Sequence, residues 1–269
     1  MHENSEQTEK RSIGSSIIAG AIVLTVFLAI EFIPRPLVSY FLPEGDPYLK
    51  WSLRSILEVG GVLVAVIAIY RTDLFGAFRE IRLTSSFTRA LGFGFLVTFP
   101  MVLAFGLTSD IGANLDLRKL VFSTAVAGFV EEVVFRGFAF WMLYRYAGWN
   151  FWPAALIPAL VFGYGHLYQS PDLMEATGIF AITAVGSVWF SWLLLRWDNL
   201  WVPIIVHMLM NFWWDVFEVD ETALGGWLAN VSRFAVIALS IIVTVNSKTA
   251  TGNEVSNHED SRSDTDAPS

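Results

Sequence analysis

The chain has 269 residues, of which 54% are hydrophobic and only 16% charged, and its mean hydropathy is +0.53. Soluble domains carry about 25% charged residues, so this composition excludes an ordinary soluble protein and predicts one that crosses a membrane several times. The net charge of −8 argues against nucleic acid as a partner, and the absence of cysteine excludes disulfides, thiolate metal sites and a cysteine nucleophile.

Apolar runs of about 20 residues predict transmembrane helices. Eight such runs occur, at residues 13–33, 53–70, 91–107, 120–144, 151–168, 176–195, 200–217 and 227–245. The first is too long for the apolar core of a signal peptide, so we expect it to be retained. The eighth is the weakest, because Arg233 interrupts it. We therefore expect an all-α fold, a polytopic membrane helix bundle of about eight transmembrane helices within residues 13–245.

The two ends of the chain are polar, and we expect tails 1–12 and 246–269 to be disordered. Eight spans place both termini on the same side of the membrane. Ten Lys and Arg residues fall on that side and six on the other. Because cytoplasmic loops carry the excess of positive charge, we expect a multi-pass cell-membrane protein with both termini in the cytoplasm and membrane lipids around it.

The fourth predicted span carries charged residues at membrane depth, in the sequence GFVEEVVFRG at 128–137. A charge near the centre of the bilayer costs about 2.5–3.5 kcal/mol even on the lenient insertion scale. Glu131, Glu132 and Arg136 should therefore face the interior of the bundle, pair with polar groups and mark a functional site.

Helical spacing separates these three residues into two roles. Glu132 and Arg136 are four residues apart, so they share a face and can form an ion pair. Glu131 precedes Glu132 by one residue, which turns its side chain by about 100° and leaves it without a cation on its own helix. This division predicts a structural brace at Glu132–Arg136 and a reactive carboxylate at Glu131.

Two later spans contribute further polar side chains. His166 lies near the end of the fifth span, and His207 and Asn211, four residues apart, share a face of the seventh. Lipid offers no partners for buried polar groups, so one shared cluster would satisfy all of them. Glutamate with histidine can deprotonate water, and histidine with asparagine can donate hydrogen bonds to an oxyanion. Alternatively, Glu131, His166 and His207 are three ligands of the kind zinc uses in hydrolases.

Three motifs occur in order on successive predicted helices: Glu-Glu-x-x-x-Arg at 131–136, Phe-x-x-x-His at 162–166 and His-x-x-x-Asn at 207–211. Together they resemble the CPBP family, which comprises CAAX prenyl proteases of type II and bacteriocin-processing proteins. The resemblance covers residues 120–217. It implies an intramembrane endopeptidase with an all-helical fold that cleaves a membrane-associated peptide or protein.

The resemblance also implies roles for the individual residues. Glu131 and His166 would activate the water, and His207 and Asn211 would form the oxyanion hole. The resemblance favours a glutamate-dependent mechanism without a cofactor, and zinc stays the alternative.

Other interpretations compete with the enzyme. Intramembrane acids and histidines also form proton relays, which would suit a proton-coupled transporter, and a catalytically silent scaffold or immunity protein could retain the same polar residues. Asn211 could simply cross-link two helices. We interpret Glu31 and Glu58, in the first two spans, as interfacial or helix-contact groups, and Asp215 as a solvated residue near the end of the seventh span.

Overall fold

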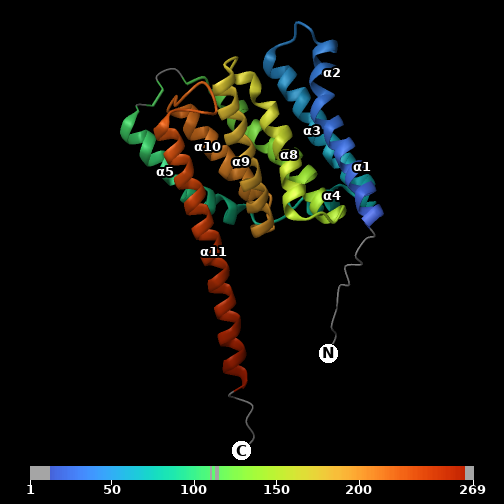
Figure 1. The fold of residues 1–269 in the computed structure, drawn as a ribbon, viewed down its shortest axis with the longest axis vertical. Coiled ribbons are helices and arrows are strands. Elements are labelled where there is room, and N and C mark those ends of the chain that lie inside the picture. The colour runs from blue at the N-terminus through green and yellow to red at the C-terminus, as the bar shows by residue number, and fades with distance from the viewer. Residues whose placement is uncertain (1–12, 110, 113–114, 264–269) are drawn as a thin grey trace, which may run out of the picture.

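The structure, a computed structural model, describes residues 13–109, 111–112 and 115–263 (Figure 1). The predicted tail at 1–12 lies outside these residues. All regular secondary structure in the described part is helical, which confirms the all-α expectation. The longer helices are α1 (Ile13–Phe32), α3 (Pro47–Tyr70), α5 (Phe87–Thr108), α8 (Phe151–Gly165), α9 (Leu173–Trp197), α10 (Trp201–Val216) and α11 (Trp227–Ser263). Shorter elements are α2 (Pro34–Phe41), α4 (Leu74–Glu80) and the 3-10 helix η4 (Leu167–Gln169).

One further helical run carries the acidic motif, and we call residues 117–146 the central helical run. It consists of α6 (Leu117–Val121), η1 (Phe122–Val126), α7 (Ala127–Glu131), η2 (Glu132–Phe140) and η3 (Met142–Tyr146), in which the three η segments are π-helical. Residues 132–143 are buried without exception. π-helical turns inside helices are frequent at functional sites.

Side-chain caps explain where several helices begin. The carboxylates of Asp46, Asp73 and Asp172 accept hydrogen bonds from the backbone N–H groups three residues later, at the starts of α3, α4 and α9. Each cap satisfies a donor that the first helical turn would leave unpaired. The short polar segments between spans therefore fix the ends of the apolar helices.

The central helical run is the middle of the main apolar core. Buried residues of α1, α3, α8 and α10 pack on it, and Phe135 makes edge-to-face contacts with Phe27 of α1 and Phe162 of α8, at 5.2 and 5.0 Å between ring centroids. A second apolar core joins α5, α9, α10 and α11. Because α10 contributes to both cores, it connects the helices that carry the predicted site to the rest of the bundle.

Every predicted span coincides with a helix, but the number of crossings is not confirmed. Five helical stretches are long and apolar enough to span a membrane: Ile13–Phe41, Pro47–Tyr70, Phe87–Thr108, Leu173–Trp197 and Trp227–Ser247. The helices α8 and α10 have only 15 and 16 residues, about 22–24 Å, which is less than the ~30 Å hydrocarbon core. Eight crossings therefore stay a prediction.

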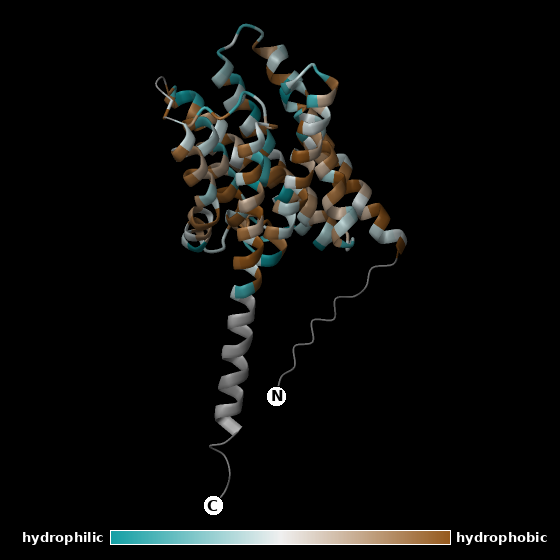
Figure 2. Cartoon of the chain, turned by 60° about the vertical axis from the view of Figure 1, so that its left-hand side comes forward, coloured by the Kyte–Doolittle hydropathy of each residue, from teal (hydrophilic) through white to brown (hydrophobic). Residues whose placement is uncertain are grey.

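The outer surface and the ends of the bundle fit a membrane protein. Large apolar side chains such as Phe95, Phe99 and Leu103 of α5 are more than half exposed. Apolar residues dominate the middle of the helices, and hydrophilic residues gather toward the two ends of the bundle (Figure 2). The beginning of α1 and the point where α11 leaves the bundle lie at the same end (Figure 1), as an even number of crossings requires.

The last helix continues beyond the predicted span. The predicted span ends at Val245, whereas α11 continues to Ser263 and overlaps the predicted tail at 246–269. Since residues 264–269 lie outside the described part, disorder of this tail stays a prediction.

Candidate active site

Glu132 is fully buried and joins two helices. One of its oxygens, Oε1, lies 2.9 Å from Nη1 of Arg136 on the same run and 2.7 Å from Nδ1 of His207 on α10. Because a carboxylate accepts hydrogen bonds, His207 donates through Nδ1. The predicted ion pair between Glu132 and Arg136 therefore exists, and it also fixes the imidazole of His207.

Glu131 points in another direction, as its position in the helix predicts. Its side chain is 32% exposed, and Oε2 lies 3.8 Å from Nε2 of His207, which is too long for a hydrogen bond. The two ring nitrogens of His207 therefore face two different glutamates. The more accessible of the two, Glu131, is the carboxylate that water or a substrate can reach.

Arg136 lies among aromatic rings with none of its side chain exposed to solvent. Its guanidinium is 4.6 Å from the ring centroid of Phe162 and 5.2 Å from that of Phe190, distances at which cation–π attraction is effective. Phe190 of α9 also stacks on His207, with centroids 5.3 Å apart and planes at 22°. Phe190 thus contacts both Arg136 and His207. The sequence gives no sign of this contact, since a phenylalanine in an apolar helix has no distinctive pattern.

His166 follows the last residue of α8. Its Nδ1 is 2.7 Å from the backbone oxygen of Phe162, which can only accept, so Nδ1 carries the hydrogen and Nε2 is free to accept. In the described part of the chain no hydrogen bond or ion pair joins His166 to Glu131. Its connection to the other site residues is through Phe162, whose ring lies 4.5 Å from the imidazole and also contacts Arg136.

Asn211 lies one turn after His207 and links α10 to the central helical run. Its side-chain nitrogen donates to the backbone oxygen of Ser123 at 3.1 Å, as the cross-linking alternative predicts. The hydroxyl of Ser123 in turn donates to Asp215. The expectation that Asp215 is simply solvated is therefore wrong, because it lies on the same face of α10 as Asn211 and is partly buried against η1.

Three charged residues of the first long helices pair with one another. Arg54 of α3 pairs with Glu58 on the same helix, Nε to Oε1 at 2.6 Å, and with Glu31 of α1, Nη2 to Oε1 at 3.7 Å. These contacts agree with our interpretation of Glu31 and Glu58 as helix-contact groups.

A metal site would need several ligands in one place. Across the described residues, no three His, Asp or Glu side chains are placed so that they could hold a metal ion. Glu131, His166 and His207, the residues of the zinc alternative, are therefore not gathered as ligands of one ion in this arrangement. The hydrogen bonds of His166 and His207 use Nδ1 and leave Nε2 as the nitrogen that could bind a metal, so the zinc alternative is a matter for the chelator experiment.

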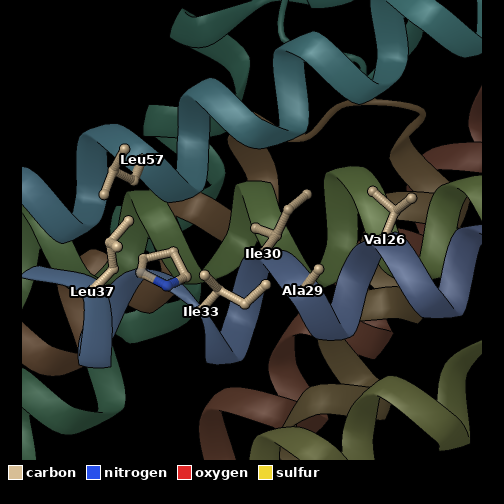
Figure 3. A pocket seen from close by; sticks show the side chains of 7 residues that line it. Val26, Ala29, Ile30, Ile33, Leu37 and Leu57 are labelled. Atoms are coloured by element: carbon tan, nitrogen blue, oxygen red, sulfur yellow. The ribbon is translucent and has the colours of Figure 1, made fainter.

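A shallow groove on α1, α2 and α3 has a different character from the site. Its volume is about 300 Å³ (Figure 3), and its lining is apolar: Val26, Ala29, Ile30, Ile33, Pro34, Leu37 and Leu57. None of the charged residues near Glu131 lines it. Such a surface suits contact with lipid chains and offers no group for catalysis.

The part of the chain that contains these residues is similar to known proteins. A family model described as "Type II CAAX prenyl endopeptidase Rce1-like" matches residues 113–213. The chain is also similar to a protein of Bacillus subtilis (strain 168) named "Putative membrane peptidase YdiL", with 32% identity over 101 residues. That match covers 38% of this chain and 37% of the relative. No solved structure matches the chain.

The matched region includes every residue predicted for the site. Glu131, Glu132, Arg136, His166, His207 and Asn211 all fall between residues 113 and 213. The helices α1, α3 and α11 lie outside it.

Proposed function

We propose that the protein is an intramembrane endopeptidase, because the central region of this membrane protein matches the Type II CAAX prenyl endopeptidase Rce1-like family model and resembles the CPBP family. The observation that carries the proposal is the position of His207, whose two ring nitrogens face Glu132 and Glu131. A buried ion pair alone would serve packing, but a histidine held between a buried and an accessible carboxylate is suited to proton transfer and hydrogen bonding during hydrolysis.

The first step is activation of water. Glu131 takes a proton from a water molecule as the oxygen attacks the carbonyl carbon of the scissile peptide bond. The other O–H of that water stays intact and donates a hydrogen bond to Nε2 of His166, which can accept because Nδ1 carries the ring hydrogen that is donated to Phe162. Glu131 then gives its proton to the leaving amine, so the products are a carboxylic acid and an amine.

The second step is stabilisation of the oxyanion that forms on the carbonyl oxygen. Asn211 has two N–H groups, of which one is bound to the backbone oxygen of Ser123 and the other is available. Nδ1 of His207 carries the hydrogen that is donated to Glu132. His207 can therefore donate to the oxyanion from Nε2 only when both ring nitrogens carry a hydrogen. Hydrogen-bond donors already in place in a dry site stabilise such an anion strongly.

The role of Glu132 and Arg136 in the proposed site is to orient the imidazole of His207. The pair fixes Nδ1 of His207, and Phe190 holds the ring from its face. We assign these residues to positioning, and we assign no step to a metal or other cofactor.

The proposed substrate is a membrane-associated peptide or protein that reaches the site from the membrane. We further propose that the protein resides in the cell membrane with both termini in the cytoplasm, because ten of the Lys and Arg residues lie on that side and six on the other.

The test is peptidase activity of the detergent-purified full chain on quenched peptides, prenylated and plain. Wild type is compared with Glu131→Gln, which keeps the shape of the side chain but cannot accept a proton, each with and without a strong chelator. We expect Glu131→Gln to reduce kcat by at least about 100-fold, the lower range for loss of a general base. Glu221→Gln, a change at an exposed glutamate, serves as the matched control.

The outcomes separate the alternatives. Cleavage that persists in Glu131→Gln contradicts the mechanism. Cleavage that chelator removes and zinc restores contradicts a metal-free reaction. A wild-type protein that cleaves none of the peptides supports a silent scaffold over an enzyme.

A further inference from the structure

Three polar residues of α10 face the central helical run at intervals of one turn. His207, Asn211 and Asp215 follow one another at a spacing of four, so they share one face of the helix. His207 is bound to Glu132 at 2.7 Å, whereas Asn211 and Asp215 both contact Ser123 of η1. The first two act in the proposed reaction, and Asp215 extends the same row by one turn.

Ser123 contacts the two α10 residues with two different groups. Its backbone oxygen accepts a hydrogen bond from the side-chain nitrogen of Asn211 at 3.1 Å, and its hydroxyl donates to Oδ2 of Asp215. The hydroxyl has only one hydrogen, for which the backbone oxygens of Lys119 and Leu120, at 2.9 and 3.4 Å, are more distant acceptors. Asp215 therefore holds the residue whose carbonyl group binds Asn211.

The stability of α10 alone does not explain a carboxylate at this position. Asp215 lies in the last turn of the helix, beside the negative end of the helix dipole, where an acidic side chain is unfavourable. It is partly buried, and among the described residues its side chain has no partner other than Ser123. The side chain thus suits the contact with η1 better than it suits the helix that carries it.

The planar amide of Asn211 makes its hydrogen bond directional. The side-chain nitrogen carries two hydrogens in the plane of the amide, so the bond to Ser123 restricts the direction in which the second N–H points. In the proposed mechanism this second N–H donates to the oxyanion, and donors held in place before the reaction stabilise such an anion most. A displaced carbonyl group of Ser123 would turn the donor away from the anion.

We propose that Asp215 is a positioning residue of the active site, which acts through Ser123 to hold Asn211 in the orientation of an oxyanion donor. The inference rests on the proposed endopeptidase function. Ser123 lies in the region that matches the family model, and Asp215 lies two residues beyond it. Because Asn211 acts on the anion that forms during the reaction, loss of Asp215 should lower kcat and leave KM unchanged.

The test uses the purified full chain and the quenched peptide that wild type cleaves best. Asp215→Leu keeps the shape of the side chain and removes the acceptor. We expect kcat to fall about tenfold or more, a part of the roughly 100- to 1,000-fold that loss of an oxyanion donor costs. The hydroxyl of Ser123 can then donate to Lys119, so the unfolding temperature in detergent should stay close to that of wild type.

Two further variants test the hydrogen bond itself. Asp215→Asn keeps an oxygen that can accept from the hydroxyl of Ser123, so it should retain most of the wild-type kcat. Ser123→Ala removes the hydroxyl and keeps the backbone oxygen that binds Asn211, and it should lower kcat about as much as Asp215→Leu does. Since both losses act through one bond, the double variant Ser123→Ala/Asp215→Leu should be no more impaired than either single variant.

A matched control is Thr244→Val, which removes another hydroxyl that joins two helices. Thr244 of α11 accepts a hydrogen bond from Nε1 of Trp197 of α9 at 2.9 Å, outside the proposed site. The variant should leave kcat and KM as in wild type.

Each outcome decides the inference. The proposal is overturned if Asp215→Leu cleaves with wild-type kcat, if its defect is confined to KM, or if Asp215→Asn is as impaired as Asp215→Leu. It is also overturned if the losses of Ser123→Ala and Asp215→Leu multiply in the double variant. If Asp215→Leu does not fold, a wild-type kcat in Ser123→Ala overturns the proposal and a kcat about tenfold lower supports it.

A purely structural contact would give a different result from a positioning residue. It would lower the unfolding temperature of Asp215→Leu and leave the kcat of the folded protein unchanged. Failure of wild type itself to cleave any peptide contradicts the proposed function instead, so the two failures are distinguishable.

Discussion

Glu131 and Glu132 are adjacent in the sequence, and the helical rotation of about 100° between them gives their side chains different surroundings. Glu132 has no exposed side-chain surface and contacts both Arg136 and His207. Glu131 is about one-third exposed, and its 3.8 Å approach to His207 is too long for a hydrogen bond. The same side chain therefore serves as a fixed counter-charge in one position and as an accessible base in the other.

This difference predicts that the same substitution, glutamate to glutamine, changes the stability of the protein by different amounts at the two positions. Glu132→Gln would leave the guanidinium of Arg136 buried without its counter-charge, and breaking a buried pair costs about 3–5 kcal/mol. Glu131→Gln would remove a partly exposed carboxylate and should leave stability nearly unchanged. Thermal unfolding of both variants in the same detergent measures the difference.

A double variant provides the control for Glu132. Glu132→Gln combined with Arg136→Met removes both charges, so it should be more stable than Glu132→Gln alone. If Glu132→Gln unfolds at the wild-type temperature, the pair does not brace the site.

At the level of elements, the site depends on how closely α7 approaches α10. Gly128 makes this approach possible, because a Cβ atom in its place would lie 2.9 Å from Cγ of Met208 and 3.2 Å from the backbone nitrogen of Met208. Met208 directly follows His207 in the sequence. The distance between these two helices therefore sets where the imidazole lies relative to Glu131 and Glu132.

Gly128→Ala should force α10 away from α7. Overpacking of this kind costs about 1–3 kcal/mol, and small displacements of catalytic groups can lower rates by up to about 100-fold. We expect a lower unfolding temperature and a kcat at least about tenfold below wild type, measured with the peptide assay.

Gly92→Ala is the matched control, since Gly92 lies in α5 and a Cβ there would meet nothing within 4 Å. It should be neutral or slightly stabilising, because alanine favours helices over glycine. A Gly128→Ala variant with wild-type kcat would show that the spacing of α7 and α10 is not critical.

The sequence predicts the elements better than the contacts among them. Apolar length locates the long helices but not the short α2 and α4, which lie outside the predicted runs. The four-residue spacing of Glu132 and Arg136 correctly predicts their ion pair. The π-helical segments escape prediction, because no residue pattern distinguishes them from α-helix. The ion pair between Glu31 of α1 and Arg54 of α3 also escapes, since helical spacing describes neighbours on one helix and says nothing about which helices meet.

At the scale of the whole molecule, the beginning of α1 and the exit of α11 from the bundle lie at one end (Figure 1). With 24 residues, α3 is about 36 Å long, enough to cross the ~30 Å hydrocarbon core and separate its two flanking loops. The loop between α4 and α5 then lies at the end where α1 begins, close to Arg79, Arg82 and Arg89. The basic excess predicts that this end faces the cytoplasm.

The absence of cysteine makes this orientation directly measurable, because a single introduced thiol is the only one in the chain. Exposed positions in three loops are suitable: Thr84→Cys between α4 and α5, Glu44→Cys between α2 and α3, and Glu221→Cys between α10 and α11. A membrane-impermeant thiol reagent applied to intact cells should label Glu44→Cys and Glu221→Cys, and should reach Thr84→Cys only after the membrane is opened.

Two departures from this pattern would each be informative. Labelling of Thr84→Cys in intact cells, with protection of the other two, would reverse the orientation and keep an even number of crossings between the loops at 44 and 221. Labelling of Glu44→Cys but not Glu221→Cys would mean that the helices between them cross an odd number of times. In that case at least one of the predicted spans between these loops does not cross the membrane, and α8 and α10, with 15 and 16 residues, are the first to test.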